Sequence, residues 1–226
     1  MFQAIIFDFD GVITDSEILH FRAFNQILAA YNIEITKKAY YTDYLGLSDR
    51  DLFTNLINNG QLGIDADQVD SLISQKNRIF EKLAKTEGCI IDGVRDFLKI
   101  LQDNKIAMAI CSGALLTEIE LILDDSNLRS FFEVIVSAEQ VKKGKPDPEG
   151  FLLTLQKISQ IKQCPLSPNQ CIVIEDSHWG IDAANAAGMH TVAITNSYDA
   201  ERLSCAEKVI NNLNELNIND LQQLCS

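Results

Sequence analysis

The chain has 226 residues, of which 46% are apolar and 23% charged, and this composition is typical of a globular protein with one or two domains. Its formal net charge of −13 disfavours nucleic acids and anionic membranes as partners, because binding to them requires a basic surface. The longest apolar run, residues 106–111, is far shorter than the roughly 20 residues that span a bilayer, so we expect no membrane-spanning helix.

The chain begins with one strand and continues with helices. Residues 4–9 are almost all apolar, which is typical of a buried strand in a parallel sheet covered on both faces, and Gly11 ends the run. From Ser16 to Tyr31 apolar residues recur every three or four positions, the pattern of an amphipathic helix. Further helical patterns cover residues 36–44, 48–59 and 66–86. We therefore predict a separate all-helical domain over residues 16–88.

Helices and strands alternate over the rest of the chain. The pattern predicts helices near residues 93–103, 115–124, 148–160 and 178–187, with strands at 106–111, 134–136, 171–174 and 191–194. Such alternation implies right-handed crossovers, so we predict an α/β fold whose doubly wound parallel sheet is built from residues 1–15 and 89–226. Ligands of such sheets bind at the carboxyl ends of the strands.

The first residues and the cysteines bear on the cellular compartment. Asp8 and Asp10 interrupt the first apolar run and no basic residue precedes it, so the run is typical of a strand and not of a signal peptide. The six cysteines include no C-x-x-C pair, which indicates neither a zinc site nor a disulfide framework. We therefore expect a cytoplasmic protein with reduced thiols, in which Cys111 packs inside a strand.

Polar segments follow the predicted strands at several points of the sequence. Those segments are Asp8–Phe9–Asp10–Gly11, Ser112–Gly113, Lys145–Pro146 and Glu175–Asp176. In a parallel sheet they converge on one edge, where two pairs of acids would repel each other at a cost of several kcal/mol without a cation. An oxygen-seeking ion such as Mg²⁺ explains the arrangement, and Lys145 supplies a second positive charge.

These residue types suit the chemistry of phosphate monoesters. A metal ion and Lys145 would remove the repulsion between a carboxylate and an anionic phosphoryl group. Asp8 would then attack phosphorus to form an aspartyl-phosphate, and Asp10 would act as general acid and later as general base. Ser112 and the amides around Gly113 would hydrogen-bond the transferring group.

The same segments resemble the four motifs of the haloacid dehalogenase-like hydrolase superfamily. The motifs occur in order over essentially the whole chain, as Asp8 to Ser16, Ser112, Lys145–Pro146–Asp147–Pro148 and Ile174–Glu175–Asp176–Ser177. The resemblance implies a Rossmann-like core with a helical cap inserted between the first two motifs. It also implies that Mg²⁺ is held by the Asp8 side chain, the Asp10 carbonyl and Asp176, with Glu175 beside the ion or bound to it. The dehalogenase reaction is disfavoured, since it needs neither a metal nor Asp10.

Within the superfamily the chain is similar to the β-phosphoglucomutase-like group, which also contains sugar phosphatases and phosphoglycolate phosphatase-like enzymes. A mutase must protect its aspartyl-phosphate from water and bind a second phosphate. Arg50 and Lys76 are candidates for binding that phosphate, and His20 is a candidate for controlling Asp10 at the hinge. Solvated helix charges and a packed histidine would also explain these three residues.

Two differences from the mutase pattern favour a phosphatase. Ser48 is followed by Asp49 before Arg50, and Ala114 stands where the mutase has a second serine. We therefore predict an Mg²⁺-dependent phosphatase, expected to be a monomer, that acts on a small phosphorylated metabolite, with sugar phosphates as one class. A β-phosphoglucomutase-type mutase is the alternative. A catalytically silent binding protein is disfavoured, because binding alone would not need both acids of the first motif.

Overall fold

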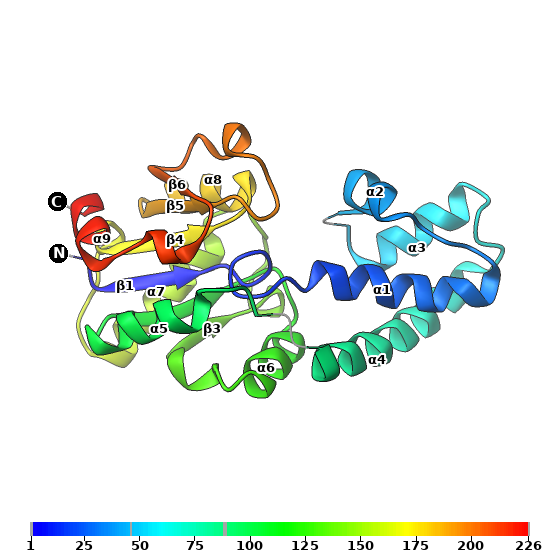
Figure 1. Ribbon diagram of the computed structural model, residues 1–226, viewed down its shortest axis with the longest axis horizontal. Helices are drawn as coiled ribbons and strands as arrows, with labels where there is room; N and C mark the ends of the chain where they lie inside the picture. The colour runs from blue at the N-terminus through cyan, green and yellow to red at the C-terminus, as the bar shows by residue number, and fades with distance from the viewer. Residues whose placement is uncertain (1, 46, 88–89, 226) are drawn as a thin grey trace. The chain divides into compact units, whose positions relative to one another are not determined.

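The computed structural model describes residues 2–45, 47–87 and 90–225. The chain divides into two compact units, a core unit of residues 1–15 with 89–226 and a helical unit of residues 16–88. Gly88 and Cys89, on either side of the predicted domain boundary, lie outside the described residues. Figure 1 shows the helices and strands of each unit.

A six-stranded sheet forms the centre of the core unit, and all its strand pairs are parallel. Its strands are β1 (Ala4–Phe7), β2 (Ala107–Cys111), β3 (Val134–Val136), β4 (Cys171–Glu175), β5 (His190–Ile194) and β6 (Lys208–Ile210). They lie in the order β3-β2-β1-β4-β5-β6, so the strand order reverses between β1 and β4. In doubly wound sheets this reversal opens a crevice at the carboxyl ends of the strands, where ligands bind.

Helices cover both faces of this sheet. They are α5 (Val94–Asp103), α6 (Leu116–Asp125), α7 (Glu149–Lys162), α8 (His178–Ala186) and α9 (Ile218–Leu224). Ile6 of β1 belongs to a buried cluster with Phe151 of α7 and Ala183 of α8. Its neighbour Phe7 points to the other face, where its ring lies 6.2 Å from that of Phe97 in α5. Burial on both faces explains why the strands are continuous apolar runs without alternation.

The predicted fold class is confirmed, and within the core unit the differences lie at the end of the chain. β6 and α9 were not predicted. β6 has only three residues and starts with Lys208, so it carries no readable alternation. The seven-residue helix α9 is too short for its apolar periodicity to stand out, although Asn217 caps it by accepting from the Asp220 amide at 3.1 Å.

The helical unit packs around its own apolar core. Its main helices are α1 (Glu17–Leu28), α3 (Asp49–Asn58) and α4 (Val69–Glu87). The predicted helix at 36–44 is a short α2 (Lys37–Ala39) that continues as a π-helical stretch, Tyr40–Tyr44. Phe24, Phe53 and Leu72 bring the three main helices together in one buried cluster. Among the described residues, no helix of either unit is both long and apolar enough to cross a membrane.

Candidate active site

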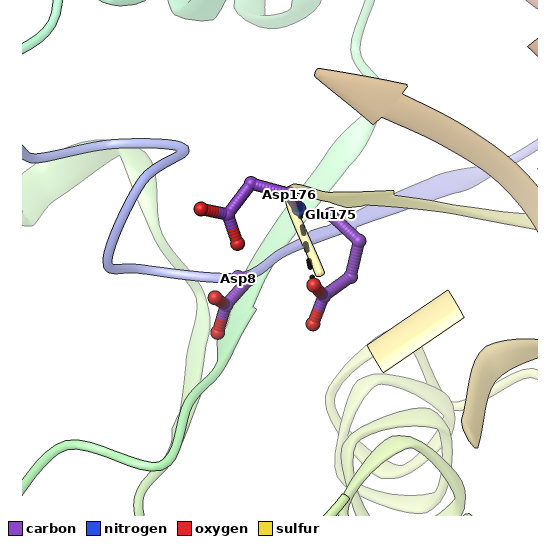
Figure 2. A group of neighbouring side chains, drawn as sticks. All are labelled: Asp8, Glu175 and Asp176. Atoms are coloured by element: carbon purple, nitrogen blue, oxygen red, sulfur yellow. Dashed lines mark hydrogen bonds between the residues drawn. The ribbon is translucent and has the colours of Figure 1, made fainter. Parts of the chain in front are cut away.

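Three carboxylates gather where β1 and β4 end. Asp8 directly follows β1, and its amide donates to the Ile174 carbonyl of β4 at 2.9 Å. Glu175 is the last residue of β4 and Asp176 follows it. Oxygens of Asp8, Glu175 and Asp176 all lie within 4.8 Å of one another (Figure 2), and all three residues are buried. The parallel register of β1 and β4 thus places these acids together at the point where the strand order reverses.

Lys145 reaches two of these acids from the loop before α7. Its Nζ donates to Asp8 Oδ1 at 2.6 Å and to Glu175 Oε1 at 2.5 Å. Burial lowers the pKa of Lys145, but the charges of Asp8 and Glu175 outweigh burial and raise it above its ordinary value. Lys145 therefore remains an ammonium group beside Asp8.

One ammonium group does not compensate all three carboxylates. Burial, followed by the nearby charges of Glu175 and Asp10, raises the pKa of Asp8 to about 7 against the opposing effect of Lys145. Burial and the charges of Asp8 and Glu175 also raise the pKa of Asp176 well above its usual range. A hard divalent cation would remove this repulsion, and a cluster of carboxylate oxygens is the donor set that Mg²⁺ prefers.

Mg²⁺ is expected to raise the Tm by about 3–6 °C more at pH 8 than at pH 6. The pKa of Asp8 is raised to about 7, so the metal-free folded state binds more protons than the unfolded state, and stability falls as pH rises from about 4 through 7. At pH 6 the ion must displace a proton from Asp8, and at pH 8 that proton is mostly absent. The free energy of Mg²⁺ binding is therefore more favourable by about 1.4 kcal/mol at pH 8. Thermal melts with EDTA or Mg²⁺ measure this, with Asp8→Asn as the control that lacks the titrating carboxyl. Equal gains at both pH values would contradict it.

The loop after β1 comes very close to the acid cluster. Gly11 has a φ of +77°, and a Cβ at this position would lie 1.7 Å from Asp176 Oδ2. Only glycine accommodates both the backbone conformation and the contact. Asp10, just before Gly11, is half-buried in this loop. The sequence pattern Asp8-x-Asp10-Gly11 is thus explained by the tight turn that carries Asp10 past Asp176.

Ser112 and Gly113 lie at the carboxyl end of the neighbouring strand β2. The Ser112 amide donates to the Val136 carbonyl at 2.9 Å, and its Oγ accepts from the Ala114 amide at 3.0 Å. Gly113 has open space where a Cβ would stand. The contact of these two residues with a transferring phosphoryl group stays a prediction.

The helical unit holds Lys76 inside a polar cluster of its own. Lys76 is 0% exposed, and its Nζ lies 2.9 and 3.0 Å from the two Asp49 oxygens and 2.7 Å from His20 Nδ1. The His20 ring stacks on Phe80 at 4.2 Å. Burial and the charge of Lys76 lower the pKa of His20 well below its usual value, so His20 is neutral and its Nδ1 accepts from Lys76.

Arg50 pairs with Asp70 at the surface of the helical unit. Both basic residues predicted to bind a substrate phosphate, Arg50 and Lys76, are therefore engaged by carboxylates of the same unit. A substrate-binding role for either of them, or for His20, stays a prediction. Asp49, which stands between Ser48 and Arg50 in the sequence, neutralises Lys76.

Asp49→Ala is expected to lower the free energy of unfolding by about 3 kcal/mol, because it leaves a buried ammonium group without its counter-charge. Urea denaturation measures this. Combining Asp49→Asn with Lys76→Met should restore most of the loss, since it removes both charges. Asp70→Ala, which breaks the exposed pair with Arg50, is the matched control and should change stability little. Equal losses for the two alanine variants would contradict a structural role of the buried pair.

Two serines contact the acid cluster, and the sequence pattern predicted a site role for neither of them. Ser177 Oγ donates to Glu175 Oε2 at 2.9 Å, and Ser197 Oγ donates to Asp176 Oδ2. Ser177 stands within the fourth motif, whereas Ser197 lies in the loop after β5. The only sequence signal for Ser197 is its place beyond the carboxyl end of a parallel strand.

Comparison with known proteins shows which family the sequence matches. Residues 5–194 match the haloacid dehalogenase-like hydrolase family. A phosphorylated carbohydrates phosphatase of Thermotoga maritima is 29% identical over 84% of this chain and 83% of its own length. The fructose-1-phosphate phosphatase YqaB of Escherichia coli is 29% identical over 85% of this chain and 96% of its own length.

Solved structures extend the similarity to the whole chain. A crystal structure of β-phosphoglucomutase from Clostridium difficile superposes with a TM-score of 0.81 at 26% identity, covering 100% of this chain and 97% of the other. The family match covers the three strand ends that supply Asp8, Ser112 and the Glu175–Asp176 pair, together with the loop that supplies Lys145. The chain therefore belongs to the haloacid dehalogenase-like hydrolase family.

Proposed function

We propose that the protein is an Mg²⁺-dependent phosphatase that hydrolyses a small phosphorylated metabolite, with sugar phosphates as the substrate class, through an aspartyl-phosphate on Asp8. The observation that carries the proposal is the position of the Asp8 carboxylate. It lies 2.6 Å from the Lys145 ammonium group. One of its oxygens and one oxygen each of Glu175 and Asp176 lie within 4.8 Å of one another, at the point where the strand order reverses. The phosphatase names of several relatives support the same reaction type.

In the first step, an Asp8 carboxylate oxygen attacks phosphorus and the bond from phosphorus to the ester oxygen breaks. The departing oxygen takes a proton from Asp10, two residues further along the tight loop. Asp8, the Asp10 carbonyl and Asp176 would hold Mg²⁺, which when bound neutralises charge on the phosphoryl oxygens. Lys145 keeps a positive charge next to the attacking carboxylate.

In the second step, water attacks the phosphorus of the aspartyl-phosphate. Asp10, now ionised, accepts a proton from this water. The bond between phosphorus and the Asp8 oxygen breaks, which releases inorganic phosphate and restores the Asp8 carboxylate. Dividing the reaction in this way replaces one slow displacement by two easier ones.

The helical unit favours a phosphatase over a mutase. A mutase must bind a second phosphate on its substrate, and Arg50 and Lys76 are the basic residues predicted for that task. In the described part of the chain, Asp70 neutralises Arg50 and Asp49 neutralises Lys76. These pairings favour substrates with one phosphoryl group. The structural similarity to β-phosphoglucomutase keeps the mutase as the second candidate.

A phosphate-release screen with Mg²⁺ tests the proposal. The substrates would be hexose, pentose and hexitol phosphates, phosphoglycolate and nucleotides, and β-glucose 1-phosphate with a bisphosphate primer would be run in a coupled mutase assay. We expect steady phosphate release from at least one sugar phosphate, abolished by Asp8→Asn. Conversion of β-glucose 1-phosphate that greatly outpaces phosphate release would establish the mutase instead. Inactivity in both assays would refute the proposed reaction.

A further inference from the structure

The adjacent acids Glu175 and Asp176 have different partners. Glu175 is 0% exposed, and its Oε1 accepts from Lys145 at 2.5 Å. Its Oε2 accepts from the Asp176 amide at 3.0 Å, the Ser177 amide at 3.0 Å and the Ser177 hydroxyl at 2.9 Å. Figure 2 shows the two carboxylates turned to different sides, with Asp176 facing the loop that follows β1. The chain alone thus occupies both oxygens of Glu175.

Ser177 and Gly180 together determine the position of the Glu175 carboxylate. Ser177 Oγ donates to Glu175 and accepts from the Gly180 amide at 3.1 Å, so it fixes the first turn of α8 and the carboxylate together. A Cβ at Gly180 would lie 1.8 Å from Glu175 Oε1. The missing side chain of Gly180 therefore makes the space in which Glu175 meets Lys145.

Ser197 fixes the other acid from a different loop. Its hydroxyl donates to Asp176 Oδ2, and the neighbouring Asn196 donates through Nδ2 to the Gly11 carbonyl at 2.7 Å. The loop after β5 is thus tied both to Asp176 and to the turn that carries Asp10. Hydrogen bonds of this kind set the orientation of a carboxylate before a metal binds.

We propose that Ser177 and Ser197 are positioning residues that give the two adjacent acids separate tasks. Ser177 holds Glu175 on the Lys145 ammonium group, and Ser197 holds Asp176 in the orientation that binds the divalent ion. The proposal rests on the phosphatase reaction proposed above and assigns Glu175 to Lys145 in place of direct metal binding. Without the two hydroxyls, both carboxylates would compete for the Lys145 ammonium group and for the divalent ion.

Two single substitutions separate these tasks. Ser177→Ala is expected to lower kcat 10- to 100-fold, the range typical of lost outer hydrogen bonds, with KM and Mg²⁺ affinity unchanged. Ser197→Ala is expected to weaken Mg²⁺ binding 10- to 100-fold while kcat recovers at saturating Mg²⁺. Mg²⁺ affinity is measured on the substrate-free protein by isothermal titration calorimetry, which does not depend on activity.

Two further variants separate positioning from helix capping. Ser177→Thr keeps the hydroxyl and should restore kcat. Asn217→Ala removes a comparable cap from α9, whose Asn217 Oδ1 accepts from the Asp220 amide, and should leave kcat and Mg²⁺ affinity unchanged. A threonine variant as impaired as the alanine variant would overturn the role of the Ser177 hydroxyl.

The metal titrations decide the proposal even without a substrate. Weaker Mg²⁺ binding in Ser197→Ala together with unchanged binding in Ser177→Ala supports the division of tasks. Equal effects of the two alanine substitutions on Mg²⁺ affinity, or no effect of either, would overturn it. A wild-type protein that binds Mg²⁺ but releases no phosphate from any substrate would refute the proposed reaction separately.

Discussion

Asp8→Asn is expected to lower kcat for phosphate release by about 10⁴-fold or more, since it removes the attacking carboxylate. The substitution changes shape little, and burial, which raises the pKa of Asp8 to about 7, favours a neutral group at this position. The variant should therefore fold normally, and its metal-free form should be at least as stable as the wild type near pH 8. Steady-state phosphate release and thermal melts measure the two effects.

A trapping experiment tests the covalent step directly. Rapid acid quenching during turnover, followed by intact mass measurement, should detect a phosphorylated wild-type chain and no phosphorylated Asp8→Asn chain. Asp96→Asn makes the same change at an exposed aspartate in the first turn of α5 and should keep wild-type activity. If Asp8→Asn retains more than a few per cent of wild-type activity, Asp8 is not the nucleophile.

Lys145→Ala is expected to lower kcat/KM by about 10²–10³-fold, the range typical of a lost charge-stabilising group. Lys145 opposes the rise in the pKa of Asp8, so its removal should raise that pKa further. Because only ionised Asp8 attacks phosphorus, the acid limb of the pH–rate profile should move to higher pH. Profiles of kcat/KM at saturating Mg²⁺ measure both the loss and the shift.

Lys143→Ala is the matched control, because Lys143 lies on the same loop but is exposed and pairs only weakly with Asp147 at 3.4 Å. It should leave both the rate and the pH profile unchanged. Similar losses of kcat/KM in the two variants would show that the overall positive charge of the loop, and not the contact of Lys145 with Asp8, accounts for the effect.

Much of the fold and of the candidate site could be predicted from local pattern alone. Continuous apolar runs separated by amphipathic helices indicate a parallel sheet, because only strands covered on both faces lack alternation. In such a sheet all strands end at one edge, so the polar segments that follow them must meet there. Asp8, Lys145, Glu175 and Asp176 were brought together on this argument, although Asp8 and Lys145 are 137 positions apart in the chain.

Short helices and strands could not be predicted from the pattern of apolar residues. β6 and α9 contain three and seven residues, too few for a period of 2 or 3.6 to be distinguished from chance. The helix predicted at 36–44 follows a helical period, but its second half adopts the wider π-helical winding, which the spacing of apolar residues does not specify.

Only the tertiary structure decided which charge pairs with which. The sequence shows two adjacent acids after β4, but the choice of Glu175 for Lys145 depends on Ser177 and on the space left by Gly180. Likewise, Lys76 has the pattern of a solvated helix charge, yet Asp49 and His20 hold it in the interior of the helical unit. The physical reason is that ion pairs act over a few ångströms between segments far apart in the chain. Sequence patterns determine where helices and strands form, whereas the partners of buried charges follow only from how those elements pack.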